Sequence, residues 1–109
     1  MICVNVLGTE YSIHIRSAAE DPFLNNCDGY TDKTVRKIVI AAKDVDNELE
    51  DFRSYQQKVL RHEIVHAFLF ESGLHECWSH DGGHDETFVD WIAVQFPKLL
   101  TAFKTVDAI

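Results

Sequence analysis

The sequence predicts an α+β fold, in which a small antiparallel sheet of about three strands precedes a long helix and two further helices. Two observations lead to this prediction. Three runs rich in β-branched residues, two of them partly alternating, lie within the first 42 positions, and apolar residues then recur at helical spacing. The 109 residues are 46% hydrophobic and contain neither an internal repeat nor a Pro/Gly/Ser-rich linker, so we expect residues 1–109 to form a single domain.

The predicted strands come first. Residues 2–7 are rich in β-branched side chains, Gly8-Thr9 supplies a turn, and residues 10–16 alternate between apolar and polar side chains. Two such runs around a short glycine-containing turn are typical of a β-hairpin. Residues 20–33 carry Pro, Asn, Asp and Gly and are predicted to be a loop, whereas residues 35–42 are predicted to be the third strand.

A long helix is predicted from about residue 47 to residue 72. Asn47 can accept hydrogen bonds from backbone N–H groups as the N-cap, and Glu50 stands three positions later, where a capping box has an acid. Gly73 is a typical residue to end this helix, because glycine adopts the left-handed conformation without strain.

A second helix is predicted to begin after Asp85, which can cap it. Its apolar stripe would consist of Phe88, Trp91 and Ile92. Phe96-Pro97 is predicted to break this helix, and Pro97 would then begin a short terminal helix that runs through Phe103.

Charge and composition restrict the function classes. The chain has 10 Lys and Arg against 18 Asp and Glu, a formal net charge of −8, so neither a nucleic acid nor an anionic membrane is expected as its main partner. Its longest apolar run is too short to span a bilayer, and its first residues lack the basic region and apolar core of a signal peptide. The three cysteines are widely separated and are expected to be free thiols. We therefore expect a soluble, cytoplasmic protein.

The most informative segment is His62-Glu63-Ile64-Val65-His66. Two histidines four positions apart lie on one face of a helix, so both imidazoles can bind one cation, for which Zn²⁺ is the usual choice. Glu63 lies about 100° round the helix from His62, close enough to hold a water at the metal and to act as a general base. The alternative is a pair of core histidines with ordinary partners. The metal site is favoured because buried His and Glu need partners and a metal provides one.

A catalytic zinc site needs a third protein ligand, with the fourth position left for water. Glu86, in the first turn of the next predicted helix, is the candidate ligand. Asp90, four positions later on the same face, would accept the ring N–H of a zinc-bound histidine, His62. Other roles stay open: Glu86 also suits the positive end of a helix dipole, Asp90 also suits a solvated surface, and His84 is the alternative third ligand.

A polar loop between the two predicted helices contains His75, Cys77, His80 and His84. One interpretation is a second metal site, although the spacing is not that of a compact zinc finger. Another is a donor that stabilises the oxyanion formed in peptide hydrolysis, supplied by a histidine of this loop, by Tyr30 or by Tyr55. A surface loop without chemistry is the third possibility.

HEIVH, followed about 20 residues later by Glu86-x-x-x-Asp90, resembles the gluzincin class of zinc metallopeptidases. Residues 86–97 also resemble the ImmA/IrrE-type metallopeptidases, in which a helix that begins with Glu ends at a similarly placed proline. The resemblance is specific from about 58 to 97 and architectural over residues 1–45, and no helix-turn-helix region is present. It implies a minimal zincin-like fold in a small intracellular peptidase of phage or mobile-element type, a group in which some members inactivate regulatory proteins.

The principal hypothesis is a zinc-dependent metallopeptidase acting on a protein or peptide substrate, with zinc held by His62, His66 and Glu86 and with Glu63 as the general base. The strand at 35–42 would form the sheet edge nearest the cleft, where an extended substrate adds a strand. One alternative is a non-catalytic, zinc-stabilised protein-interaction module, and another is a zinc hydrolase of RNA. The acidic composition argues against RNA, and a structural metal site has no use for Glu63.

Overall fold

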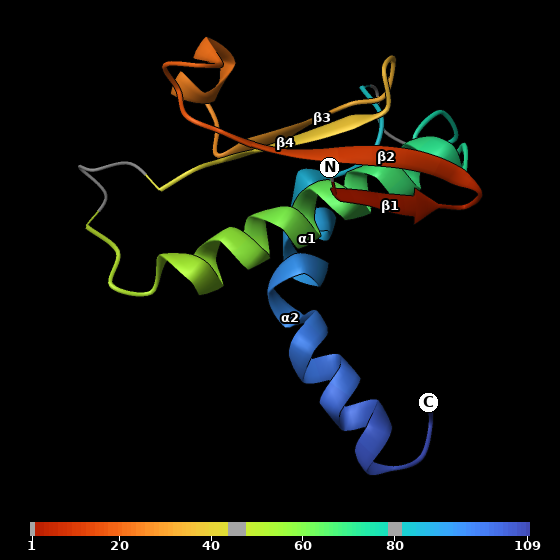
Figure 1. Cartoon of the computed structure of the whole chain (residues 1–109). Helices are drawn as coiled ribbons and strands as arrows, with labels where there is room; N and C mark the ends of the chain where they lie inside the picture. The colour runs from red at the N-terminus through yellow and green to blue at the C-terminus, as the bar shows by residue number, and fades with distance from the viewer. Residues whose placement is uncertain (1, 44–47, 79–81) are drawn as a thin grey trace.

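The computed structural model describes residues 2–43, 48–78 and 82–109 of the chain and has the predicted α+β class. A four-stranded sheet precedes two long helices; α1 lies against the sheet, and α2 crosses α1 and runs away from it (Figure 1). The elements are β1 (Ile2–Val6), β2 (Thr9–Arg16), the 3-10 helix η1 (Pro22–Asn25), β3 (Gly29–Asp32), β4 (Lys37–Ala41), α1 (Phe52–Glu71) and α2 (Glu86–Thr105). Neither helix, within these residues, has the length and hydrophobicity needed to cross a membrane.

β1 and β2 form the predicted hairpin, with Val6 opposite Thr9. The turn lies at Leu7-Gly8, one residue earlier than predicted, and both residues have positive φ, 52° and 92°. The Asn5 side chain accepts a hydrogen bond from the Gly8 N–H at 2.9 Å. Two positive φ values between paired strands match the sheet's own twist, so this turn fixes the hairpin register.

The sheet is mixed, which corrects the prediction of an antiparallel sheet of about three strands. Its order is β1-β2-β4-β3, with β2 and β4 parallel and the other neighbours antiparallel. A parallel return needs a long connection, and residues 17–36 supply it; they contain η1 and β3, where the sequence predicted only a loop. The edges are therefore β1 and β3, and β4, which is the predicted strand 35–42, lies inside the sheet.

α1 begins later than predicted. The side chain of Asp51, not Asn47, caps it and accepts from the Ser54 N–H at 3.0 Å. Asn47 lies outside the described residues, and Glu50 precedes the helix and is exposed, so it forms no first-turn capping pair. The predicted end is confirmed, because Gly73 follows the last turn with a φ of 80°.

α2 is one helix, although the sequence predicted a break at Phe96-Pro97. Proline has no N–H and so leaves the carbonyl four residues earlier, at Ala93, without its helical partner. Arg61 of α1 fills this vacancy, because its Nε donates to the Ala93 oxygen at 2.6 Å. The neighbouring helix thereby lets α2 continue through Pro97 to Thr105.

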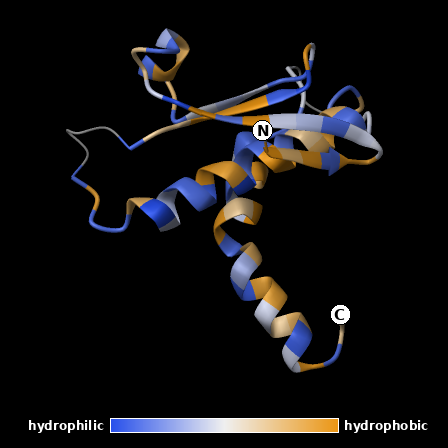
Figure 2. Ribbon diagram, in the orientation of Figure 1, coloured by the Kyte–Doolittle hydropathy of each residue, from blue (hydrophilic) through white to orange (hydrophobic). Residues whose placement is uncertain are grey.

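The predictions for the start of α2 and for its buried face had different outcomes. The cap is confirmed, since Asp85 accepts from the Thr87 N–H at 2.7 Å. Of the predicted apolar stripe, Ile92 is half-buried, but Phe88 and Trp91 are 40% and 55% exposed, and the fully buried residues are Val89 and Ala93. Hydrophobic segments recur along the whole length of α2, interspersed with hydrophilic ones (Figure 2), so hydrophobicity alone did not identify the buried face.

The core lies between the sheet and α1. It is formed by Val6, Tyr11, Ile38, Ile40, Val59 and Ala67. Tyr11 is fully buried and donates from its hydroxyl to Glu71 at 2.7 Å; burial and this carboxylate raise the pKa of Tyr11 to about 12. The contact ties β2 to the last turn of α1 and helps to set the position of α1 beneath the sheet.

Candidate metal centre

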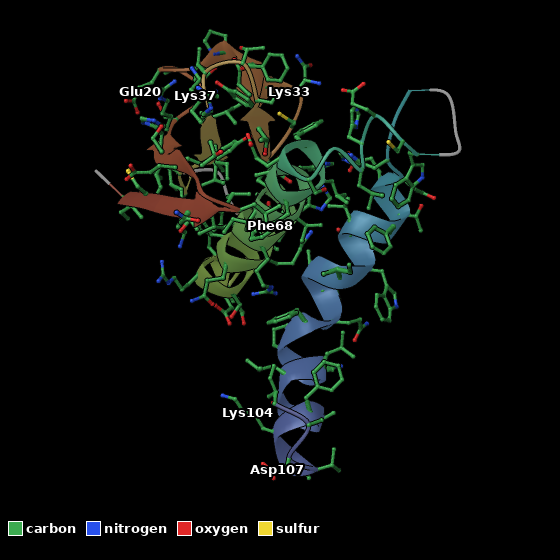
Figure 3. All side chains as sticks on the ribbon, turned by 90° about the vertical axis from the view of Figure 1, so that its right-hand side faces the viewer. Glu20, Lys33, Lys37, Phe68, Lys104 and Asp107 are labelled. Atoms are coloured by element: carbon green, nitrogen blue, oxygen red, sulfur yellow. The ribbon has the colours of Figure 1, made fainter. Side chains whose placement is uncertain are left out.

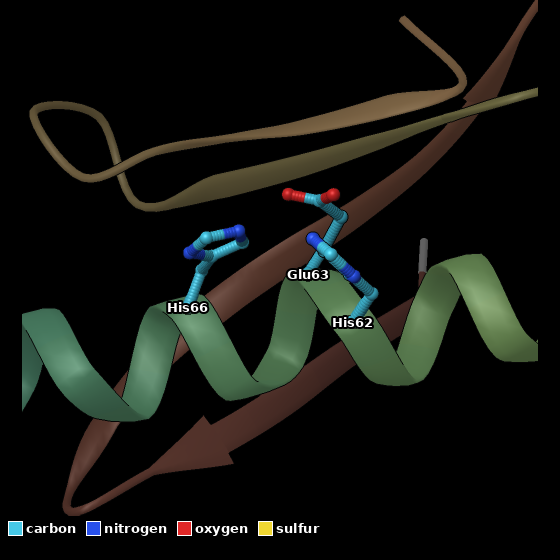
Figure 4. A group of neighbouring side chains, drawn as sticks. All are labelled: His62, Glu63 and His66. Atoms are coloured by element: carbon cyan, nitrogen blue, oxygen red, sulfur yellow. The ribbon is translucent and has the colours of Figure 1, made fainter. Parts of the chain in front are cut away.

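His62, Glu63 and His66 rise from one stretch of α1 toward the strands (Figure 4). The carboxylate of Glu86, at the start of α2, lies between the two imidazoles. Its Oε2 is 3.0 Å from Nε2 of His62, and its Oε1 is 2.9 Å from Nε2 of His66. The crossing of α1 and α2 therefore brings together the three residues that the sequence proposed as metal ligands.

The other ring nitrogen of each histidine faces an outer partner. Nδ1 of His62 lies 3.3 Å from Oδ1 of Asp90, and Nδ1 of His66 lies 2.5 Å from Nε2 of His84. Both imidazoles thus present Nε2 to the Glu86 carboxylate and Nδ1 away from it. This is the arrangement in which an outer acceptor fixes the ring orientation of a metal-binding histidine.

Two overlapping groups have the donor atoms to hold a metal ion. One consists of His62, Glu63 and His66, and the other of His66, His84 and Glu86, with donor atoms within 4.8 Å of one another. The short contact of His84 is with Nδ1 of His66, on the side of the ring away from Glu86. His84 therefore contacts the Nδ1 side of His66 and Glu86 the Nε2 side, while donor atoms of all three residues lie within 4.8 Å of one another.

Glu63 is buried and is held by a side chain from the sheet. The hydroxyl of Thr31, on β3, lies 3.0 Å from both Oε1 and the backbone oxygen of Glu63. Burial raises the pKa of the Glu63 carboxyl, and the Thr31 hydrogen bond and the nearby His62 oppose that rise. Sequence reasoning missed Thr31, because four residues of strand inside a turn-rich segment carry too weak a signal.

β3 passes very close to α1 at Gly29. A Cβ atom there would lie 3.0 Å from Cγ1 of Val59 and 3.1 Å from the Val39 oxygen. A side chain at this position would therefore need Val59 or the Val39 carbonyl to give by a few tenths of an ångström. The glycine thus permits the close approach of β3 to α1, a feature that sequence reasoning also missed.

A cleft of about 480 Å³ opens over these residues, between β3, α1 and the start of α2. Its lining includes both tyrosines proposed as oxyanion donors, Tyr30 and Tyr55. Their hydroxyls already donate to aspartates, Tyr30 to Asp21 and Tyr55 to Asp28. The Asp28 hydrogen bond and burial raise the pKa of Tyr55 to about 12, so this phenol keeps its proton at neutral pH.

The loop residues are less uniform than their spacing suggested. Nδ1 of His75 lies 2.8 Å from Nδ1 of His84, so the two rings continue outward from His66. Cys77 is exposed and belongs to neither group of donor atoms in the described part of the chain. His80 lies outside the described residues. Like Cys77, Cys3 and Cys27 are free thiols, as predicted.

The donors fit a zinc ion. Burial lowers the pKa of His66 to about 4, so its imidazole is neutral at pH 7, the form that binds a metal. Donor atoms about 2.0–2.1 Å from a tetrahedral zinc lie roughly 3.3 Å apart. The observed Nε2-to-oxygen distances of 2.9 and 3.0 Å are only a few tenths of an ångström shorter.

Comparison with protein-family models, curated proteins and solved structures gives no match for this chain.

Proposed function

We propose that this chain is a zinc-dependent metallopeptidase with a minimal zincin-like fold, in which His62, His66 and Glu86 bind the metal and Glu63 is the general base. One observation carries the proposal: the Nε2 atoms of both histidines share one carboxylate, while a second carboxylate, Glu63, is held separately by Thr31 beside an open cleft. A purely structural site has no need of that second carboxylate.

The bound metal would supply Lewis acidity, which lowers the pKa of water and polarises a carbonyl. Glu63 accepts the proton of the attacking water and delivers it to the leaving amine. Its buried position, which raises the pKa of the carboxyl, favours the protonated form needed for the second step. The Thr31 hydroxyl orients this carboxylate, and Asp90 and His84 hold the two imidazole rings.

The free edge of β3 is the surface on which we place the substrate, instead of the strand 35–42 predicted from the sequence. The Asp28 carbonyl accepts from the Ala41 N–H at 2.8 Å. Because backbone groups alternate in direction along a strand, those of Gly29 and Thr31 face away from β4. An extended peptide pairing with these groups passes directly beside Glu63.

The experiment compares Glu63→Gln with Glu48→Gln, a matched change at an exposed residue ahead of α1. Each zinc-loaded protein is incubated with a mixed peptide library, and products are identified by mass spectrometry. We expect wild type and Glu48→Gln to cleave, Glu63→Gln to be inactive, and all three to retain zinc, because the amide keeps the shape of the acid without its basicity.

Two outcomes would contradict the proposal. Release of zinc by Glu63→Gln would make Glu63 a ligand instead of a base. Stoichiometric zinc in a wild-type protein that cleaves no peptide of the library would favour the alternative, a non-catalytic zinc-stabilised interaction module.

A further inference from the structure

The second half of α2, from Phe96 to Thr105 and the C-cap residue Val106, extends beyond the rest of the molecule (Figure 1). Every residue from Thr101 to Ile109 is exposed. Figure 3 shows Lys104 and Asp107 at the free end of the helix, away from the sheet and α1. The helix ends in a defined way, because Asp107 has a φ of 58° and the Ala108 N–H donates to the Phe103 oxygen at 2.8 Å.

Four apolar side chains form a continuous stripe along this half, which we call the α2 seam: Phe96, Leu99, Phe103 and Val106. Their alternating spacing of three and four residues is the heptad spacing of helices that pack against each other. Counting back, the same stripe contains Val89, which is fully buried where α2 crosses α1. In the second half of α2, Phe96, Phe103 and Val106 are 44%, 41% and 73% exposed.

The charged and polar side chains of this half lie away from the seam. At about 100° per residue, Lys98 and Lys104 point roughly 110–130° from its centre. Thr101 lies on the opposite face, where its hydroxyl donates to the Pro97 oxygen at 3.0 Å. Covering the seam with another helix would therefore bury no lysine, and the desolvation cost of a buried charge does not arise.

We propose that a second copy of this chain covers the α2 seam, with the two helices antiparallel in a two-fold symmetric dimer. In antiparallel pairing Phe96 faces the partner's Val106 and Leu99 faces the partner's Phe103, so each large side chain meets a smaller one. Parallel pairing would place like residues opposite each other and bring together two bodies from chains of net charge −8. Antiparallel helices place those bodies at opposite ends.

The area available agrees with a weak dimer. With about 200 Å² for a whole phenylalanine side chain and correspondingly less for the aliphatic ones, the exposed parts of the seam and its flanking Leu100, Ala102 and Ile109 come to roughly 400–500 Å² per copy. Two copies would bury about 800–1,000 Å², near the lower bound of specific interfaces. We therefore expect dissociation in the micromolar range. This dimer does not depend on the proposed peptidase activity.

Sedimentation equilibrium of the full, zinc-loaded chain over the micromolar range tests the proposal. The wild-type mass should rise from the 12.5 kDa of the monomer toward twice that value. Leu99→Glu and Phe103→Glu place a charge in the seam and should stay monomeric throughout. Thr101→Glu adds the same charge on the opposite face and should dimerise like wild type.

Zinc content and circular dichroism, measured on every variant, show whether the body is folded. If the glutamate variants fail to fold, Leu99→Ala and Phe103→Ala replace them. Each should weaken dimerisation at least about tenfold, since one substitution removes two central apolar contacts from a two-fold symmetric interface. A wild-type protein that is monomeric at all concentrations overturns the proposal. So does a folded Phe103→Glu variant that dimerises as tightly as wild type.

Discussion

The two halves of α2 have a similar hydrophobic content, but the first half is packed against α1 and the second half is largely exposed. In the first half Val89 and Ala93 are fully buried, and Glu86 and Asp90 reach the histidines of α1. In the second half Phe103 and Val106 are as apolar, yet 41% and 73% exposed. Hydropathy does not separate the two halves; the position of α1 does.

This difference explains why the proposed metal site involves only the first half of α2. The proposed metal ligands come from two helices and meet only where the helices cross. The site therefore forms only when the first half of α2 packs against α1. The second half can change without moving any donor atom. The following predictions, from the largest expected effect to the smallest, test whether the two halves are as independent as the structure implies.

Removal of the metal should have the largest effect. His66→Ala should lose the zinc, about one per chain in wild type, because binding of a structural or catalytic metal is also folding free energy. Zinc at about 1,000 times its Kd stabilises a fold by about 4 kcal/mol. Loss of this stabilisation should lower the Tm by more than about 10 °C. Elemental analysis and thermal melts measure both.

The matched control for His66→Ala lies in the second half of α2. Thr101→Ala should keep full zinc content and a Tm close to wild type. Addition of a chelator to wild type should reproduce the His66→Ala melt. Wild-type protein that holds no transition metal after expression with added zinc would refute the site.

Next in size is the loss of single contacts within the site. Glu86→Ala removes an anionic ligand and should weaken zinc affinity more than any other change in α2. Asp90→Ala and His84→Ala remove only outer partners of the histidines, and each should cost about 10–100-fold. Competition with a zinc chelator gives the order, and Lys104→Ala should leave the affinity unchanged. A maximal loss in His84→Ala with none in Glu86→Ala would make His84 the third ligand.

A direct comparison of the two halves uses Val89→Ala and Phe103→Ala. Val89→Ala leaves a cavity at the fully buried crossing and should lower the free energy of unfolding by roughly 2 kcal/mol. Phe103→Ala removes a larger side chain from an exposed position and should change it by less than about 0.5 kcal/mol. Urea titrations of dilute protein, where the monomer predominates, measure both. Equal losses would show that the second half packs against the body in solution.

The smallest expected effect is on stability, at the point where the two halves of α2 meet before Pro97. Arg61→Met removes the donor that satisfies the Ala93 carbonyl and should lower the free energy of unfolding by about 1 kcal/mol. Pro97→Ala restores the backbone N–H, so Arg61→Met should cost much less in that background. A double-mutant cycle measures this coupling, and additive effects would mean that Arg61 does not support the helix at Pro97.

Local features of this chain followed from its sequence. The hairpin turn, the Asp85 cap and the end of α1 at Gly73 depend on residues close together in the chain, whose backbone preferences act without the rest of the molecule. The four-residue spacing of His62 and His66 places both imidazoles on one face of any helix. In each case the interacting residues are close together in the chain, so the sequence itself shows both partners.

Other features needed the tertiary structure. β3 is too short to be recognised and forms because β4 pairs with it, and Thr31 reaches Glu63 only because that pairing lies over α1. α2 continues through Pro97 because a side chain 36 positions earlier in the sequence supplies the missing donor. Neither partner is visible from the neighbouring residues.

The sequence by itself determined the residue types of the site and the helix that carries two of them. It left open whether Glu86 or His84 would be the third ligand of the proposed metal, because both follow His66 by a similar distance, 20 and 18 positions. The tertiary structure gives the two residues different places, because the crossing of α1 and α2 puts Glu86 against Nε2 of His66 and His84 against Nδ1. The physical reason is that one imidazole offers its two nitrogens in different directions, and only the packing of the two helices decides which neighbour each nitrogen meets.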